Sequence, residues 1–213
     1  MAEQVLPVDS AVADLGVRLV AFTISGLDNR DYRPALRDWL EDVPGLRQRL
    51  SSSLGDHFDA ALQGFRVLRE RTGRSWRRFP PSCQSLVDSY QRRGGLPKIS
   101  PAVDCYNALS VASGLSLGAH DLRAIRGAVR LTLSRGGEAF CPLGSEKRQT
   151  LPAGEYIYCD DRAVLCRMDY RQARHSAFRA DTTDGLFIVQ GHDAIPMDYI
   201  EGVARELRRC LAL

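Results

Sequence analysis

The chain has 213 residues, of which 44% are hydrophobic and 26% are charged, and its formal net charge is +3. This length and composition are those of one or two globular domains, which excludes a fibrous or disordered chain. No stretch has the roughly 18 consecutive apolar residues that a membrane helix needs. The first residues also lack the basic and apolar segments of a secretory signal. We therefore expect a cytoplasmic protein with no membrane partner.

The chain lacks the sequence signals of the common metal and cofactor sites. It has no phosphate-binding loop, no dinucleotide-binding glycine fingerprint, no zinc-protease helix and no nucleophile elbow. The four histidines are dispersed, and the six cysteines lack the paired spacing of a zinc site. We therefore expect neither a metal nor a cofactor. We also expect free, mostly buried thiols, because the cytosol keeps most cysteine pairs reduced; a structural disulfide is the alternative.

Helical patterns fill most of the first half of the chain, after one strand. Residues 17–24 combine β-branched and aromatic side chains, which predicts a buried strand. Residues 35–50 have roughly helical spacing that Pro44-Gly45 interrupts, so we expect two short helices or one broken helix. Clearer helices are predicted over residues 56–71, from Ser82 to Gly94, and from Ser100-Pro101 to residue 113.

Strand patterns dominate the second half. Residues 129–133 alternate between apolar and polar side chains, and residues 186–189 are a short apolar run. Residues 156–159 and 163–166 flank Asp160-Asp161 as in a hairpin, and an amphipathic helix ends the chain. Helices gathered before strands favour an α+β fold over an alternating parallel sheet. We expect a single domain over residues 1–213.

Eight short motifs follow one another in an order that resembles a known family. They are Ser82-Cys-Gln-Ser-Leu86, Gly95-Leu-Pro-Lys-Ile99, Val103-Asp-Cys-Tyr-Asn107, Ala119-His-Asp-Leu122, Gly127-Ala-Val-Arg-Leu131, Gly137-Glu-Ala-Phe140, Gly154-Glu-Tyr-Ile-Tyr-Cys-Asp160 and Cys166-Arg-Met-Asp-Tyr-Arg-Gln172. From about Arg74 to Gly191 the chain resembles a free-standing B3/B4 domain, the editing domain of the phenylalanyl-tRNA synthetase beta subunit. The resemblance implies a B3/B4-like fold with a core at 73–191, loosely matched strand and helices at 1–72 and a terminal helix at 192–213.

The resemblance implies a trans-acting aminoacyl-tRNA deacylase, because this domain hydrolyses the ester that joins a wrong amino acid to tRNA. Its partner would be the acceptor end of a tRNA. Such an ester is already activated, so a protein that orients it and one water accelerates hydrolysis without a nucleophilic triad. Two alternatives are a transferase that passes the amino acid to a small amine, and a tRNA- or RNA-binding module without catalysis.

One departure from the family concerns a histidine. Where the synthetase loop reads Pro-Leu-His-Ala-Phe-Asp, this chain has Ser116-Leu-Gly-Ala-His-Asp121. The resemblance implies that the missing histidine helps to hold the ester. Either His120 takes over this role from a loop, or it has no chemical part.

Three further candidates for the site come from strand ends and from the helix after Pro101. Glu138, after Gly136-Gly137, could meet the substrate ammonium or orient water, or it is a solvated turn acid. Family position suggests that Asn107 meets or braces the pocket. Ser176 is expected to cap, line or satisfy the pocket and not to attack, because its neighbour His175 would point to the opposite side of a strand.

Arg167, Asp169 and Arg171 follow the second strand of the expected hairpin. Strand alternation would send these three side chains to one face. Such a row could bind the terminal ribose or a phosphate, or form a salt-bridge ladder on the surface.

A basic run with interleaved aromatic residues is the candidate RNA-binding surface. Residues 51–100 carry nine basic and four acidic side chains. Guanidinium groups bind phosphates and aromatic rings stack on unpaired bases, as a tRNA acceptor end would require. The alternative is a solvated helix face with a tryptophan in the core. The candidates are Arg66, Arg69, Arg74, Trp76, Arg77 and Arg78.

Overall fold

A four-stranded antiparallel sheet forms the centre of the computed structural model, which describes residues 2–213. Its order is β1 (Ala2–Glu3), β2 (Val17–Ile24), β10 (Gly185–His192) and β3 (Ser116–Asp121). Phe22 of β2 lies opposite Phe187 of β10, and their rings stack with centroids 5.4 Å apart. All eight residues of β10 are buried, as expected for a central strand covered on both faces.

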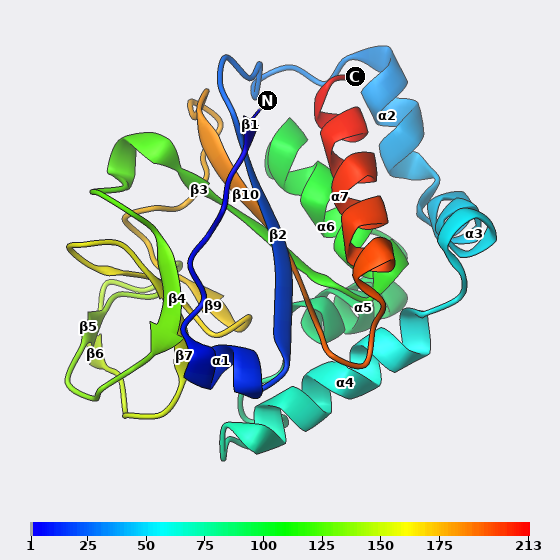
Figure 1. The fold of residues 1–213 in the computed structure, drawn as a ribbon. Coiled ribbons are helices and arrows are strands. Elements are labelled where there is room, and N and C mark those ends of the chain that lie inside the picture. Colours follow the sequence, from blue (N-terminus) through cyan, green and yellow to red (C-terminus); the bar gives the residue numbers. More distant parts are fainter. Residues whose placement is uncertain (1) are drawn as a thin grey trace.

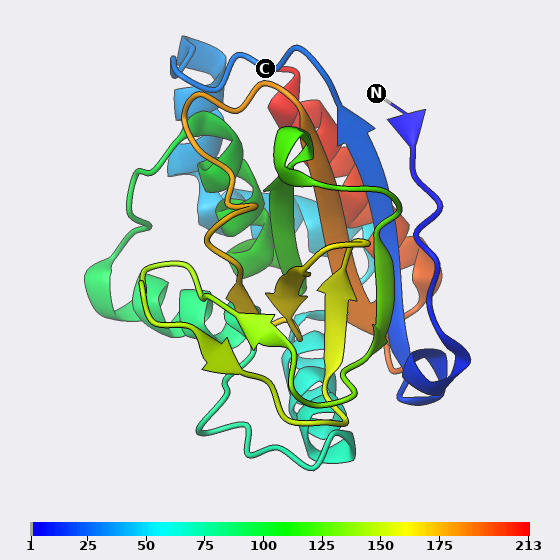
Figure 2. The ribbon, with the colours of Figure 1, turned by 90° about the vertical axis from the view of Figure 1, so that its left-hand side faces the viewer.

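A second antiparallel sheet lies beside the first and is nearest the viewer in Figure 2. Its order is β4 (Arg130–Leu133), β7 (Tyr156–Cys159), β8 (Val164–Arg167) and β9 (Arg171–Gln172). A small two-stranded sheet joins β5 (Ala139–Phe140) to β6 (Gln149–Thr150).

Most of the helices gather on the face of the first sheet that lies away from the second sheet (Figure 1). The helices are α1 (Ser10–Asp14), α2 (Pro34–Glu41), α3 (Val43–Leu54), α4 (Phe58–Arg71), α5 (Ser82–Arg93), α6 (Pro101–Ser113) and α7 (Met197–Leu211), with a 3₁₀ turn, η1 (Leu122–Ala124). No helix within residues 2–213 is both long and apolar enough to cross a membrane. The α+β class predicted from the sequence is confirmed.

The central helix α6 is buried along its whole length. All thirteen of its residues are buried, and it packs against α3, α5, α7 and β3. The proline at its first position has the fixed backbone angle that starts a helix, and Gly114 ends it in the left-handed conformation with φ 73°. This helix therefore holds its side chains in fixed positions at the centre of the molecule.

Residues 34–54 form two helices, but the break lies before the expected Pro44-Gly45. Asp42 separates α2 from α3, and its carboxylate accepts a hydrogen bond from the backbone N–H of Gly45 at 2.9 Å. Pro44 therefore lies in the first turn of α3, where a missing N–H costs no hydrogen bond.

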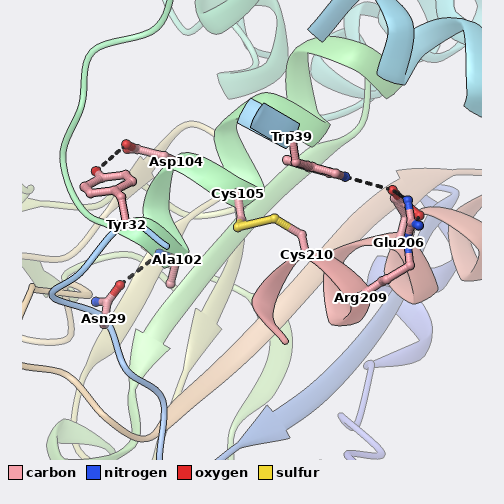
Figure 3. Close-up of a disulfide and its surroundings, with 9 residues drawn as sticks. All are labelled: Asn29, Tyr32, Trp39, Ala102, Asp104, Cys105, Glu206, Arg209 and Cys210. Carbon is pink, nitrogen blue, oxygen red and sulfur yellow. Dashed lines mark hydrogen bonds and ion pairs between the residues drawn. A yellow bond between two sulfur atoms is a disulfide. The ribbon is translucent and has the colours of Figure 1, made fainter. Parts of the chain in front are cut away.

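A disulfide joins α6 to α7, which corrects the expectation of free thiols for two of the six cysteines (Figure 3). Cys105 and Cys210 are 105 residues apart in the sequence, yet their Cα atoms lie 6.3 Å apart, within the range that a disulfide spans. The packing of α7 on α6 creates this proximity, and no local pattern indicates it. The other four cysteines are free: Cys83, Cys141, Cys159 and Cys166.

Candidate functional site

A cavity of about 510 Å³ opens between α5, α6, β3, β10 and the turn that joins β8 to β9. This volume is in the range of sites that bind small organic ligands. Its walls are partly apolar, with Val103, Leu117, Phe178 and Ile188 among them. The polar residues that line it are Ser82, Ser85, Tyr106, Asn107, Ser116, His120, Tyr158, Asp169, Tyr170, Arg171, Gln172 and Gln190.

The side-chain amide of Asn107 is available to a ligand in this cavity. Asn107 is held by α6 and is only 8% exposed, and it lines the cavity. None of the side-chain hydrogen bonds among the described residues involves the Asn107 amide, although most buried amides are paired. Because α6 is immobilised by packing, the backbone that carries this donor and acceptor is in place before a ligand arrives.

His120 lies in the same cavity, on strand β3 and not on a loop. Its Nδ1 is 3.0 Å from the hydroxyl oxygen of Ser176 and 3.2 Å from Nε2 of Gln172. Its Nε2 has no hydrogen-bond partner within the described residues. Burial, together with the neighbouring His175, lowers the pKa of His120 from 6.5 to about 4. The ring is therefore neutral near pH 7, with one nitrogen free for a ligand or water.

Ser176 supports His120 and does not line the cavity. The turn after β9 carries it, so the strand expected there is absent, and its side chain is fully buried. Its hydroxyl lies against His120, while its backbone carbonyl accepts from the N–H of Asp121 at 3.1 Å. This places Ser176 as a positioning residue behind the histidine ring.

The burial of His120 predicts a loss of stability in acid. The unfolded chain protonates this histidine near pH 6.5 and the folded chain only near pH 4, so the unfolded state binds more protons between these values. Its contribution to stability is complete above pH 6.5 and falls by about 3 kcal/mol as the pH drops to 4. Urea unfolding at several pH values should show that His120→Gln removes this part of the pH dependence. The matched variant His57→Gln keeps His120 and should keep the wild-type slope; equal slopes for all three proteins would contradict the assignment.

A buried ion pair forms the floor of the cavity. Asp169 lines the cavity, and one of its carboxylate oxygens accepts from Nη2 of Arg69 at 2.6 Å. The hydroxyl of Tyr156 donates to the same oxygen, and burial keeps the pKa of Tyr156 well above its usual value. Both charged side chains are almost completely buried, so each neutralises the other. The floor is therefore polar but carries no net charge.

The turn that carries Asp169 breaks the strand alternation expected for residues 167–171. Strand β8 ends at Arg167, and Met168 has a φ of 52°, so Asp169 leaves the face on which Arg167 and Arg171 lie opposite each other. Arg167 is buried and donates to both carboxylate oxygens of Glu155, at 2.6 and 2.7 Å. Arg171 is exposed and lines the cavity.

The structure separates Glu138 from the cavity. The carboxylate accepts from the backbone N–H groups of Arg135 and Gly136 at 2.6 and 3.0 Å, which closes the turn after β4. Glu138 lines a different and larger depression of about 1080 Å³, which we call the outer hollow. Backbone N–H groups of its own turn occupy both carboxylate oxygens of Glu138. These contacts agree with the alternative that Glu138 is an acid that stabilises a turn.

The basic run divides between the core and the surface. Arg69 is fully buried in the ion pair with Asp169, so it does not lie on the surface where RNA would bind. Arg66 lies over the ring of Trp76 at 4.6 Å, and Arg77 lies over the same ring at 5.5 Å. Arg74 and Arg78 lie on a separate groove next to the cavity, where Arg74 also pairs with Glu155 at 2.7 Å.

Sequence reasoning missed several groups that complete the cavity. The hydroxyl of Tyr158 donates to Oε1 of Gln190 at 2.6 Å, and Nε2 of Gln190 donates to the hydroxyl of Tyr156 at 3.2 Å. Gln172 donates to the backbone carbonyl of Ala119 at 2.5 Å and so fixes the strand that holds the histidine. Gln172 belongs to the last of the eight motifs, and this membership could have indicated that it lies at the site. Gln190 lies in an apolar strand, where no sequence pattern indicated a role in the site.

Comparison with solved structures supports the fold. The whole chain aligns with half of an N-terminal fragment of the phenylalanyl-tRNA synthetase beta subunit from Pyrococcus horikoshii, with a TM-score of 0.52 and 13% sequence identity. At this identity the likeness shows the fold alone. Comparison with curated proteins gave no match.

A family model extends the match beyond the eight motifs at both ends. The model of the B3/4 domain matches residues 66–205, which is more than half of the chain and includes Asn107, His120 and Asp169. The matched span also contains every strand of the second sheet. The chain therefore belongs to the B3/4 domain family.

Proposed function

We propose that this protein is an aminoacyl-tRNA deacylase, and that the cavity holds the amino acid and the adenosine to which it is esterified. Family membership supports a tRNA-related role, and the likeness in fold to a fragment of the phenylalanyl-tRNA synthetase beta subunit points in the same direction. The observation that carries the proposal is the pairing of an unpartnered amide, Asn107, with an unpartnered imidazole nitrogen of His120 in one ligand-sized cavity.

The reaction that fits this pair is the hydrolysis of an ester. Water attacks the carbonyl carbon, a negative charge forms on the carbonyl oxygen, and the bond to the ribose oxygen then breaks. The Asn107 amide would donate a hydrogen bond to the developing oxyanion. With the hydrogen of its neutral ring on Nδ1, directed at the Ser176 hydroxyl, His120 would accept a hydrogen bond from the attacking water through Nε2, and the proton would pass to the departing ribose oxygen. The products are a free amino acid and a tRNA with its hydroxyl restored.

The remaining walls suit the other parts of such a substrate. Val103, Leu117 and Ile188 form an apolar wall for the side chain of the amino acid. The neutralised Asp169 contributes a polar floor without attracting water as a free carboxylate would. The lining of the cavity thus divides into an apolar part and a polar part, as an aminoacyl ester requires.

Asn107→Ala provides the direct test. Incubation of the wild-type protein with a panel of mischarged tRNAs should release the amino acid from at least one of them. Loss of an oxyanion donor should lower kcat by roughly 100-fold with a small effect on KM. Asn107→Asp keeps the volume and loses the amide donor, so it should also be slow.

Gln48→Ala removes an exposed amide on α3 and should retain full activity. The proposal fails if no tRNA in the panel is deacylated faster than without protein. It also fails if the Asn107→Ala protein deacylates tRNA as fast as the wild type does, while a cooperative thermal unfolding transition shows that the variant is folded. Release that requires an added amine would instead identify a transferase.

A further inference from the structure

A groove lined with arginines runs into the cavity. The groove has a volume of about 490 Å³ and is lined by Arg74, Arg78, Arg167 and Arg171, with Phe79 and Tyr170 between them; we call it the arginine groove. Tyr170 and Arg171 also line the cavity, so the two spaces meet at these residues. A linear ligand that lies in the groove could therefore place its end in the cavity.

The arginine groove carries an excess of positive charge. Four arginines line it, and none of its lining residues is an aspartate or a glutamate. The buried Glu155 pairs with both Arg74 and Arg167. These three side chains together therefore carry a net charge of +1. Arg78 and Arg171 form no salt bridge within the described chain. The outer hollow differs, since four arginines there face four carboxylates.

The guanidinium groups of the groove are held against aromatic rings. The rings of Phe79 and Tyr170 meet edge to face with centroids 5.4 Å apart. Arg167 lies over Phe79 at 4.6 Å, and Arg171 lies over Tyr170 at 5.1 Å. Contacts to Glu155 also fix Arg74 and Arg167, so part of the groove is oriented before binding. Phosphates pair with such forks, and bases stack on rings and on guanidinium planes.

We propose that the arginine groove binds the sugar-phosphate backbone of a single-stranded RNA 3′ end and leads its last nucleotide into the cavity. The inference rests on the proposed function for the identity of the RNA end, but the groove itself is tested by binding alone. Alternating cations and aromatic rings favour a single-stranded polynucleotide, because an isolated phosphate or a lipid headgroup offers no bases for stacking.

Binding of uncharged RNA gives the first test. Fluorescence anisotropy would compare an RNA hairpin that ends in a four-nucleotide 3′ overhang with the same hairpin ending bluntly. Arg78→Ala should weaken binding of the overhang RNA by roughly tenfold. It should also reduce the slope of log K against log salt by about 0.7, the value for one phosphate contact on a single strand.

Arg148→Ala is the matched control, because Arg148 is an exposed arginine of the outer hollow. It should bind the overhang RNA as the wild type does. Arg78→Ala should not change the weaker binding of the blunt hairpin. The groove assignment is overturned if the two variants lose the same affinity, or if the overhang does not improve binding by the wild type.

Hydrolysis of two esters separates this inference from the proposed function. Arg78→Ala should raise KM for an aminoacyl-tRNA and leave hydrolysis of the corresponding aminoacyl-adenosine unchanged, because the small ester does not reach the groove. A protein that hydrolyses neither ester but needs Arg78 for overhang RNA would keep the groove and reject the deacylase. If the Arg78→Ala variant hydrolyses both esters at the same rates as the wild type, the groove does not bind the RNA, whereas the proposed deacylase activity stands.

Discussion

Replacement of Asp169 by asparagine is expected to lower the free energy of unfolding by about 3–5 kcal/mol, as measured by urea unfolding near pH 7. The partner, Arg69, is 0% exposed and would keep a positive charge in the core without its carboxylate. The hydroxyl of Tyr156 would lose its charged acceptor, because the oxygen of an asparagine amide is neutral. Because Asp169 lies on the floor of the cavity, this variant should also lose ligand binding where it still folds.

Two further variants show whether the charge is the cause. Asp193→Asn breaks the pair with Arg71 on the surface, where both side chains are about two fifths exposed, and should cost less than about 1 kcal/mol. The double change Arg69→Met and Asp169→Leu removes both charges and should recover much of the loss. If Asp169→Asn were no more costly than Asp193→Asn, the buried pair would not be what stabilises the floor.

Loss of the disulfide is the second large effect that we expect. Cys105 and Cys210 close a loop of 105 residues, and a crosslink over such a loop stabilises a protein by roughly 4–5 kcal/mol through the entropy of the unfolded chain. The double change to alanine should therefore lower the urea midpoint strongly. Addition of a reductant should lower the midpoint of the wild type in the same direction and should leave that of the double variant unchanged.

A thiol titration of the denatured protein provides the accompanying check. Four thiols should react before reduction and six after it, since four cysteines are free. Cys141→Ser removes a free cysteine and should keep the response to reductant. Six reactive thiols without reductant would show that the bond does not form in solution.

The sequence predicted well those helices and strands whose side-chain pattern and end signals lie close together along the chain. The strand at 17–24 has the same ends in the structure, and the helix from Pro101 to Ser113 begins and ends at its predicted proline and glycine signals. The two-residue strands β1, β5, β6 and β9 were missed because two residues are too few to show alternation. Local interactions specify the first group, whereas sheet pairing alone specifies the second.

The candidate site divides in the same way. The motif order pointed to Asn107, His120 and Asp169, and the structure places all three around one cavity. The pairing of Asp169 with Arg69 joins residues 100 positions apart, so sequence spacing could not show that this arginine belongs to the core. The role of Glu138 likewise depended on the direction in which a turn presents its carboxylate, which composition does not determine.

The complete burial of α6 has a consequence for the evolution of substrate preference. A change of size along this helix disturbs its packing against six neighbouring elements, including the helix to which Cys105 is bonded. Ile99 and Leu143, in contrast, line the cavity at its rim and are 57% and 46% exposed. A lineage that diversifies its specificity would therefore accumulate replacements at these two rim positions, while the helix that carries Asn107 stays constant.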